Sequence, residues 1–347
     1  MNTNVNTVVN TNAAMTLNLE FNPELLTDKE KSVIEPSWDG ECAVLKDLPL
    51  PKDVKVAVHD GEFHSDDVMC VALLRIFAGF DPIEDRIIRT RDKALLQQAD
   101  LRLDVGSGLL DHHNERSAGY GLCAASRVFA LLRQSGCFSK YDARIVEKLA
   151  GLIDKVAAVD TGDPSATGHW IIEMVQAFNR HGVVSGRDHF ELAVDHVTDA
   201  VVCLLETWEA AIDAERAAMD AIRRSIDSNQ PEIVDFPVGS RAANCKRLIH
   251  DHAPQAIYFV SPEVVGGALR SWRVLCAADP DREFEDEKSL TFSNRKKIPA
   301  KFCGLEYAAL DAATGIAGGI FSHKDGFIAG FKTHDAAVEF AKLCLAS

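Results

Sequence analysis

The sequence predicts an α/β protein: a parallel sheet covered by helices, then a helical spine and a smaller α/β domain. Between residues 54 and 105, short β-branched runs alternate with segments of helical periodicity, which is the pattern of a parallel sheet. Residues 124–226 then have mainly helical periodicity, and strand-like runs return after residue 229. A chain of 347 residues is long enough for two domains, because one domain usually takes ~100–200 residues.

The first domain is expected to begin with alternating strands and helices. Residues 54–58 form a β-branched run that stops at the polar stretch 59–64, so we expect a strand followed by a loop. Ser65 is a good N-cap for a helix over 66–78, whose first acids suit the positive end of the helix dipole. Further strands are expected at 86–90 and 101–105, with a short helix at 93–99.

The middle of the chain predicts helices and the C-terminal part a mixed domain. The helices are expected at 124–134, 142–159, 170–179 and about 187–226, and the length of the last one predicts a spine between domains. The sequence Asp-Ser-Asn-Gln-Pro at 227–231 should end that spine. Later strands are expected at 256–260, 272–277, 319–322 and 327–331, with a closing helix at 334–345.

The domain boundaries follow from these elements. Residues 1–51 are rich in Asn and Thr and end in Leu-Pro-Leu-Pro, so we expect a poorly structured lead-in. We expect a catalytic domain at 52–228 and a C-terminal substrate-binding domain at 229–347.

Composition limits the possible functions. A hydrophobic content of 47% excludes wholesale disorder. The net charge of −15 means that the protein has no global positive field, so a DNA-coating role is not expected and any nucleic acid must be held by a local site.

The cysteines and the N-terminus bear on the compartment. Nine scattered cysteines with no C-x-x-C pair indicate reduced thiols, no disulfide-linked partner and a cytoplasmic or nuclear location. No apolar run approaches the ~20 residues of a membrane span, so no membrane association is expected. The first 28 residues contain no Lys or Arg, which argues against a secretory signal or a mitochondrial presequence.

Histidines and aspartates gather where the expected strands and helices end. They are His59, His64 and Asp66 after the first strand, Asp104 after the third, the triplet Asp111, His112 and His113, and Asp160 at the end of a helix. Ligands of parallel sheets bind at the carboxyl ends of the strands, so these side chains can converge. A single His-Asp pair would most often be a surface or capping feature. The whole set, which contains no cysteine, suits Mn²⁺ or Mg²⁺, and an Asp104 shared between two ions would give a two-metal site.

The same residues resemble a known family, the melanocyte proliferating gene (Myg) family of the DHH phosphoesterase superfamily. The resemblance covers about residues 54–347. Its motifs are His-Asp-Gly-Glu-Phe-His-Ser-Asp-Asp at 59–67, Arg-Thr-Arg-Asp at 89–92, Asp-Val-Gly at 104–106, Asp-His-His at 111–113, Ala-Val-Asp at 158–160, Ser-Trp-Arg-Val at 271–274 and the glycine-rich stretch at 315–330.

The resemblance implies a two-manganese phosphodiesterase, regarded as a 3′-to-5′ exonuclease on single-stranded RNA, with an older label of metal-dependent protein hydrolase. Mg²⁺ is the alternative ion. The implied metal ligands are His59, His64, Asp66, His112 and Asp160, with Asp104 as the bridging carboxylate. His113 would face the substrate phosphate, and Asp111 would accept a ring N–H so that the triplet imidazole presents the correct nitrogen.

The sequence departs from the wider superfamily in a few places. His64 stands where an aspartate is usual, one position further from His59, although the Myg branch shares that pattern. Thr-Gly-Asp follows Asp160, and the segment at 298–305 keeps an aromatic residue but lacks the usual arginine. Substrate preference can therefore differ from that of other members.

The C-terminal domain offers candidate substrate-binding residues. Its glycine-rich stretch has two interpretations, tight turns between strands or a phosphate-binding backbone. The basic run at 295–297 is either a solvated loop or a path for a single strand. The candidates are Arg273, Arg295, Lys296, Gly318, Gly319 and His323.

Three functions remain open at this point. The leading one is exonucleolytic cleavage of single-stranded RNA. The second keeps the metals but acts on short oligonucleotides, cyclic dinucleotides or pyrophosphate. The third is a binding or scaffold protein without turnover, which the presence of all six implied ligands disfavours. The sequence leaves the oligomeric state open.

Overall fold

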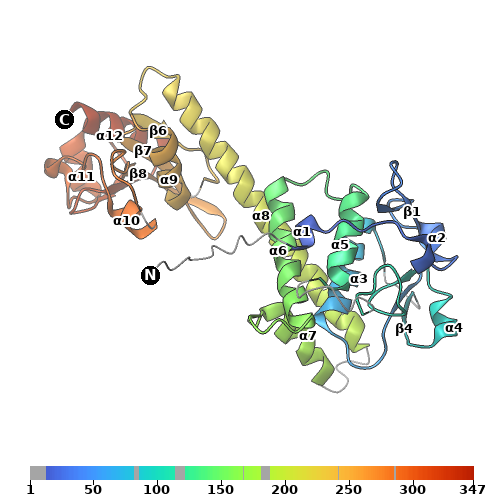
Figure 1. Ribbon diagram of the computed structural model, residues 1–347. Coiled ribbons are helices and arrows are strands. Elements are labelled where there is room, and N and C mark those ends of the chain that lie inside the picture. Colours follow the sequence, from blue (N-terminus) through green and yellow to red (C-terminus); the bar gives the residue numbers. More distant parts are fainter. Residues whose placement is uncertain are drawn as a thin grey trace, which may run out of the picture. The chain divides into compact units, whose positions relative to one another are not determined.

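Figure 1 shows the computed structural model, which describes residues 13–81, 86–113, 122–166, 168–180, 188–240, 242–284 and 287–347. The chain divides into two units, Met1–Trp208 and Glu209–Ser347. The division falls inside the long helix α8, His189–Ile226, whereas the sequence predicted it after residue 228, close to the end of that helix. The helix therefore contributes residues to both units, which are described separately below.

The first unit is built on a small parallel sheet. Its strands are β3 (Val56–Val58), β4 (Ile87–Arg89) and β5 (Leu101–Arg102), arranged in the order β4-β3-β5 with both pairs parallel. The central strand β3 is fully buried, as its β-branched sequence requires. The predicted α/β class and its parallel sheet are confirmed.

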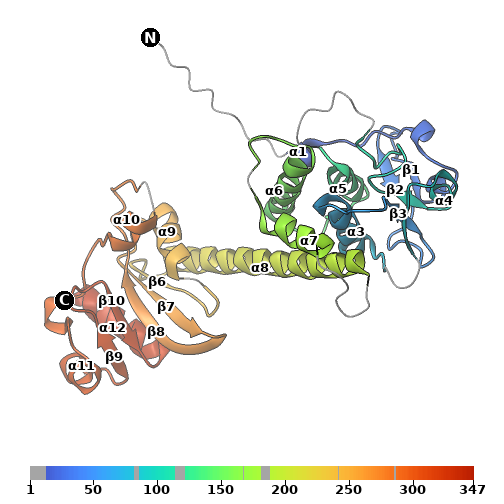
Figure 2. The same cartoon turned by 90° about the horizontal axis from the view of Figure 1, so that it is seen from below.

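Helices cover this sheet where the sequence predicted them. Helix α3 (Ser65–Ala78) follows β3 and packs against α5 (Ala124–Gln134) and α6 (Ala143–Asp160), and Figure 2 shows the three together. Helices α4 (Lys93–Leu96) and α7 (Trp170–Arg180) also belong to the first unit and precede α8 in the sequence. The expected strand at 101–105 is shorter than predicted: β5 ends at Arg102, Leu103 forms an isolated bridge with Leu110, and Asp104 takes a left-handed conformation.

The N-terminal segment differs from its prediction. Residues 13–51 are not a poorly structured lead-in but contain short elements packed on the first unit. Their buried apolar side chains include Ala14, Ile34 and Ala43, which lie among polar residues and give no periodic pattern. The elements are α1 (Ala13–Thr16), η1 (Pro23–Leu25), α2 (Glu30–Val33) and the antiparallel strands β1 (Ile34–Pro36) and β2 (Ala43–Leu45). Residues 1–12 lie outside the described part.

The second unit is built on a mixed sheet in the order β6-β7-β8-β10-β9. Strands β6 and β7 are parallel, and the remaining neighbours are antiparallel. The strands are β6 (Ile233–Asp235), β7 (Tyr258–Val265), β8 (Ala268–Cys276), β9 (Gly319–Ser322) and β10 (Ile328–Phe331).

Helices lie on both faces of this sheet. Helix α12 (His334–Ala346) packs on the face that carries Tyr258 and Val260, while α9 (Ala242–His252) and the end of α8 pack on the face of Phe259. The predicted closing helix is confirmed. The sequence missed β6, α9, α10 (Glu287–Phe292), η2 (Ala300–Phe302) and α11 (Tyr307–Thr314), which are short or lack strong periodicity.

Two chain-wide observations complete the fold. All nine cysteines are free thiols, and five of them are buried. Among the described helices, none is both long enough and apolar enough to cross a membrane.

Candidate metal centre

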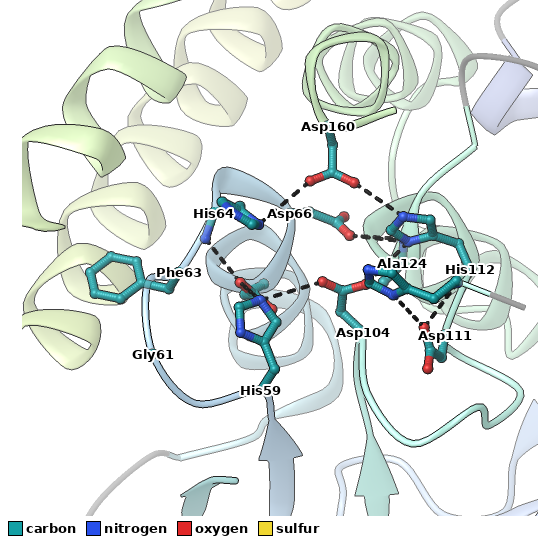
Figure 3. Close-up of polar contacts among 12 residues, drawn as sticks. His59, Gly61, Phe63, His64, Asp66, Asp104, Asp111, His112, Ala124 and Asp160 are labelled. Carbon is teal, nitrogen blue, oxygen red and sulfur yellow. Dashed lines mark hydrogen bonds and ion pairs between the residues drawn. The ribbon is translucent and has the colours of Figure 1, made fainter. Parts of the chain in front are cut away.

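The histidines and aspartates of the motifs meet at the carboxyl ends of the strands in the first unit. His59 directly follows β3, and Asp104 lies two residues after β5. The first turn of α3 carries Asp66, and Asp160 is the last residue of α6. Figure 3 shows these side chains pointing toward one another with the imidazole of His112. The convergence expected from the strand ends is therefore present.

Asp104 occupies the centre of this group. Its Oδ1 lies 3.1 Å from Nδ1 of His112 and 3.2 Å from Nδ1 of His113, and its Oδ2 lies 3.7 Å from Nε2 of His59. The residue has a φ of 55°, a left-handed conformation that is uncommon outside glycine. Strain of that kind costs on the order of 1–3 kcal/mol and persists where the surrounding structure holds a functional side chain in place.

Asp66 and Asp160 also lie close to the imidazole of His112. Asp66 is completely buried and accepts hydrogen bonds from the backbone N–H groups of Ala124 (3.0 Å) and Ala125 (2.7 Å), at the start of α5. Oδ2 of Asp160 lies 3.3 Å from Nε2 of His112. Burial raises the pKa of both carboxyl groups, and their mutual repulsion with Asp104 raises it further. A nearby cation would relieve this cost.

The position of Asp111 differs from its expected role. Its Oδ1 lies 2.8 Å from Nδ1 of His113 and also accepts the backbone N–H of that residue, while Oδ2 accepts the N–H of Ser107 at 2.7 Å. Asp111 therefore orients His113 rather than His112. The close approach of the Asp104 carboxylate, opposed by partial burial and helped by Asp111, raises the pKa of His113 to about 10.

Asp67 is a residue that the sequence interpretation missed. It is fully buried, its Oδ2 lies 2.9 Å from Nε2 of His59, and it accepts the N–H of His64 at 2.9 Å. His64, and not Ser65, is consequently the N-cap of α3. On the sequence alone, Asp66 is assigned to the metal ligands but Asp67 is related only to the helix dipole. The signal that could have distinguished Asp67 is its spacing of three residues from the N-cap, the position of the reciprocal partner in a capping box.

The donor set fits divalent cations. Three groups of side chains have ligand atoms within 4.8 Å of one another: Asp104 with Asp111, His112 and His113; His59 with His64 and Asp67; and Asp66 with His112 and Asp160. Buried atoms without a hydrogen-bond partner include Oδ1 of Asp67, Oδ1 of Asp104 and Nδ1 of His112. The ion-pair partners of these carboxylates are histidines only, within the residues described. So many buried carboxylates without Lys or Arg partners indicate a site for metal ions with oxygen and nitrogen ligands.

A cavity of about 470 Å³ opens onto this centre. His59, His64, Asp104 and His113 line it together with three cations that the sequence interpretation did not propose: Arg91, Lys93 and Arg102, the last of which is paired with Glu30. Arg91 forms an ion pair with Asp60. The motif at 89–92 is among those found in the sequence, but the spacing of its residues does not predict that Arg91 lines the cavity.

A second arginine of the same motif supports the loop that carries the histidines. The guanidinium of Arg89 lies 5.2 Å from the ring centres of both Phe63 and Phe190, and it donates a hydrogen bond to the carbonyl of Gly61. Asn179 also bonds the backbone of Phe63. The loop between His59 and His64 is therefore fixed by side chains from β4, α7 and α8.

The structure does not show a common site for the candidates of the second unit. Arg295 donates to the carbonyls of Pro254 and Ala256, and Lys296 donates to those of Cys344 and Leu345.

Four other candidates of the second unit also have local partners. Arg273 pairs with Glu263. The N–H groups of Gly318 and Gly319 are bound by the carboxylate of Asp311, which corrects the expectation that this backbone is bare. His323 packs on Phe327, with ring centres 4.3 Å apart.

The comparison with known proteins agrees with the motifs. A family model described as an uncharacterised protein family (UPF0160), with the short name MYG1_exonuc, matches residues 55–131 and 137–345. The chain belongs to this family. The membership predicted from the motifs is thus confirmed.

Members of the family are found across distant organisms. The human MYG1 exonuclease is 26% identical over 337 residues, covering 84% of this chain and 86% of the human protein. The MYG1 protein C694.04c of Schizosaccharomyces pombe is 27% identical over 335 residues, covering 84% and 97%. The solved structure of RecJ with Mg²⁺ from Thermus thermophilus aligns with 86% of this chain and 51% of its own, at 13% identity and a TM-score of 0.24. A TM-score of that size does not establish a shared fold.

Proposed function

We propose that this protein is a metal-dependent exonuclease that removes nucleotides from single-stranded RNA in the 3′-to-5′ direction, with two Mn²⁺ ions. The observation that carries the proposal is the position of Asp104 between a group containing His59 and a group containing His112, beside a cavity that Arg91 and Lys93 line. Family relatives named as exonucleases support the same activity.

Each ion would have its own ligands, and Asp104 would be shared. His59, His64 and Asp67 are close enough to hold one ion, and Asp66, His112 and Asp160 the other. Bound there, the ions would supply an activated water and neutralise charge on the phosphate. Mn²⁺ and Mg²⁺ both accept this oxygen and nitrogen set, and the six residues inferred from the motifs are all in it.

The remaining polar residues of the cavity would position the substrate. His113 presents its ring to the cavity and is oriented by Asp111, so it would contact a phosphate oxygen of the bond to be cleaved. Arg91 and Lys93 would bind neighbouring phosphates through charge-assisted hydrogen bonds. Free cysteines are compatible with a cytoplasmic or nuclear location.

One observation favours the second candidate, a phosphohydrolase for short substrates. A cavity of about 470 Å³ is in the range of a site for a single small ligand. In the second unit, Arg295, Lys296 and the backbone at 318–319 already have protein partners, so they offer few contacts to a long strand.

A length series separates these functions. Single-stranded RNA and DNA of 2 to 20 nucleotides, labelled at either end, would be incubated with the full chain and Mn²⁺. Release of mononucleotides from the 3′ end of RNA at every length supports the proposal. Turnover of dinucleotides alone supports the second candidate. Absence of turnover with every substrate would support the third function, a binding protein without catalytic activity. Asp142→Asn, which changes an N-cap remote from the metal centre, is the control for Asp104→Asn.

A further inference from the structure

The second unit contains a cavity of about 500 Å³ that does not belong to the metal centre. It lies beside strand β6, between the end of α8 and helix α12, and residues 221–342 supply its entire lining. Trp272 of β8 and His334, the first residue of α12, form part of its wall. Their rings meet edge to face, with centres 4.7 Å apart.

The cavity lies at the β6 edge of the sheet, and the predicted substrate residue Arg273 is not part of its lining. Successive side chains of a strand point to opposite faces, and Trp272 packs with the α12 core while its neighbour Arg273 pairs with Glu263. The function proposed above therefore does not use this cavity. Binding here can be measured whether or not the protein cleaves RNA.

The charge of the cavity is positive although the chain carries −15. Arg224 and Lys342 line it, and neither has an ion-pair partner within the part of the chain that the structure describes. The next arginine along the helix, Arg223, is neutralised by Asp220 at 3.2 Å. The one carboxylate of the lining, Asp235, is paired with His334 at 2.7 Å. Two cations thus remain available to an anionic ligand.

We propose that this cavity binds a nucleoside monophosphate. The phosphate would lie at Arg224 and Lys342, since a doubly charged anion suits two cations at once. The base would stack on the partly buried indole of Trp272, because every base offers a π-face to an aromatic side chain. The polar side chains of Asn229 and Gln230, also in the lining, offer donors and acceptors to the edge of a base. A volume of about 500 Å³ is in the range of small-ligand sites.

Calorimetric titration of the full chain with AMP in EDTA tests the proposal. EDTA removes metal ions, so the metal centre is not loaded during the titration. We expect one AMP per chain with a Kd below about 1 mM. Adenosine and inorganic phosphate, each carrying half of the ligand, should bind at least about tenfold more weakly. Arg224→Ala should weaken AMP binding by about tenfold, and Arg223→Ala should change it less than about twofold.

Tryptophan fluorescence locates the ligand. AMP should quench the emission of the wild type, and Trp272→Phe should abolish the quenching while retaining binding, because phenylalanine keeps an aromatic face. A single-stranded oligonucleotide ending in a phosphate tests whether the site takes a strand end as well as a free nucleotide.

Three results would overturn the proposal. The first is inorganic phosphate binding as tightly as AMP, which would mean a simple anion site. The second is equal weakening in Arg223→Ala and Arg224→Ala, and the third is AMP binding that appears only with Mn²⁺. Failure of the RNA assay above would leave these measurements unaffected.

Discussion

At the scale of single residues, buried carboxylates dominate the chemistry of the protein. Asp66, Asp67 and Asp104 are all buried, although aspartate side chains usually lie on the protein surface. Burial without a strong cation is costly for a carboxylate, so the arrangement is stable when divalent ions neutralise it. The separate roles proposed for Asp104 and His113 rest on their positions, one between the ligand groups and the other at the cavity wall.

Removing either residue should give a different defect. Asp104→Ala should lose both ions and all measurable activity, because the Asp104 carboxylate lies between His59 of one ligand group and His112 of the other. His113→Ala should retain both ions and lose about 10²–10⁴-fold in turnover, as expected for a residue that contacts the substrate. Metal content per chain, measured by elemental analysis after gel filtration, separates the variants. Equal metal loss in both would contradict the assigned roles.

The stability of the second unit should depend on one buried lysine. Lys246 of α9 is almost completely buried, and this burial lowers the pKa of its ammonium group from 10.5 to about 8. The folded state therefore disfavours the charged form. Below about pH 8 this penalty is fully present, and it disappears as the pH rises toward 10.5, where the unfolded chain also loses the proton.

Lys246→Met should thus stabilise the protein near pH 7 by on the order of 3 kcal/mol, and the advantage should shrink as the pH approaches 10.5. Urea denaturation at pH 7, 9 and 10.5 measures the difference in the free energy of unfolding from the wild type. Lys332→Met, at an exposed lysine of the same unit, is the control. A pH-independent difference would show that the pKa of Lys246 is not lowered.

At the scale of elements, the N-terminal segment supports the loop that carries Asp104. Glu30 of α2 is buried and forms a capping box with Thr27, and its carboxylate also binds the side chain of Arg102 in β5. Arg102 in turn donates to the carbonyl of Gly106 at 2.9 Å. Gly108 is required next to it, since a Cβ there would lie 2.8 Å from the guanidinium. The segment therefore connects to the turn after Asp104 through a buried ion pair.

Breaking this pair should be costly. Glu30→Gln leaves the buried guanidinium of Arg102 without its charge partner, for which a loss of about 3–5 kcal/mol in the free energy of unfolding is expected. Glu35→Gln, at an exposed position of the neighbouring strand β1, should change it by less than about 0.5 kcal/mol. Denaturant titrations of both variants test this. A loss below about 1 kcal/mol for Glu30→Gln would mean that the segment is only loosely attached.

At the scale of the whole molecule, a net charge of −15 opposes the binding of a polyanion. Affinity for a strand must come from a few local cations. The sequence placed these in the second unit, at Arg295 and Lys296, but both have backbone carbonyls as partners. Arg91 and Lys93, at the cavity of the metal centre, are the better candidates.

Salt dependence of RNA binding distinguishes the two pairs. Removing one cation that binds a phosphate should reduce the slope of log K against log salt by about 0.7 for a single strand. Arg91→Ala with Lys93→Ala should therefore lower the slope by about 1.4, and Arg295→Ala with Lys296→Ala should leave it nearly unchanged. The measurement uses fluorescence anisotropy of a labelled RNA in EDTA, which prevents metal-dependent cleavage. If the slope falls instead in the Arg295 and Lys296 variant and stays unchanged in the Arg91 and Lys93 variant, the RNA strand contacts the second unit.

The sequence by itself determined the alternation of strands and helices, the long helix α8, and the metal-binding character of the residues at the strand ends. These features are local, because β-branched runs, helical periodicity and residue chemistry are all properties of short segments. The tertiary structure decided the rest. Only the folded structure shows how residues 13–51 pack, which histidine Asp111 orients, that Asp67 contacts His59, and that Lys296 donates to backbone carbonyls of α12. Each of these features is a contact between side chains or segments whose geometry forms when the chain folds. Hydrogen-bond partners and burial are properties of three-dimensional neighbours, and the order of residues along the chain does not specify them.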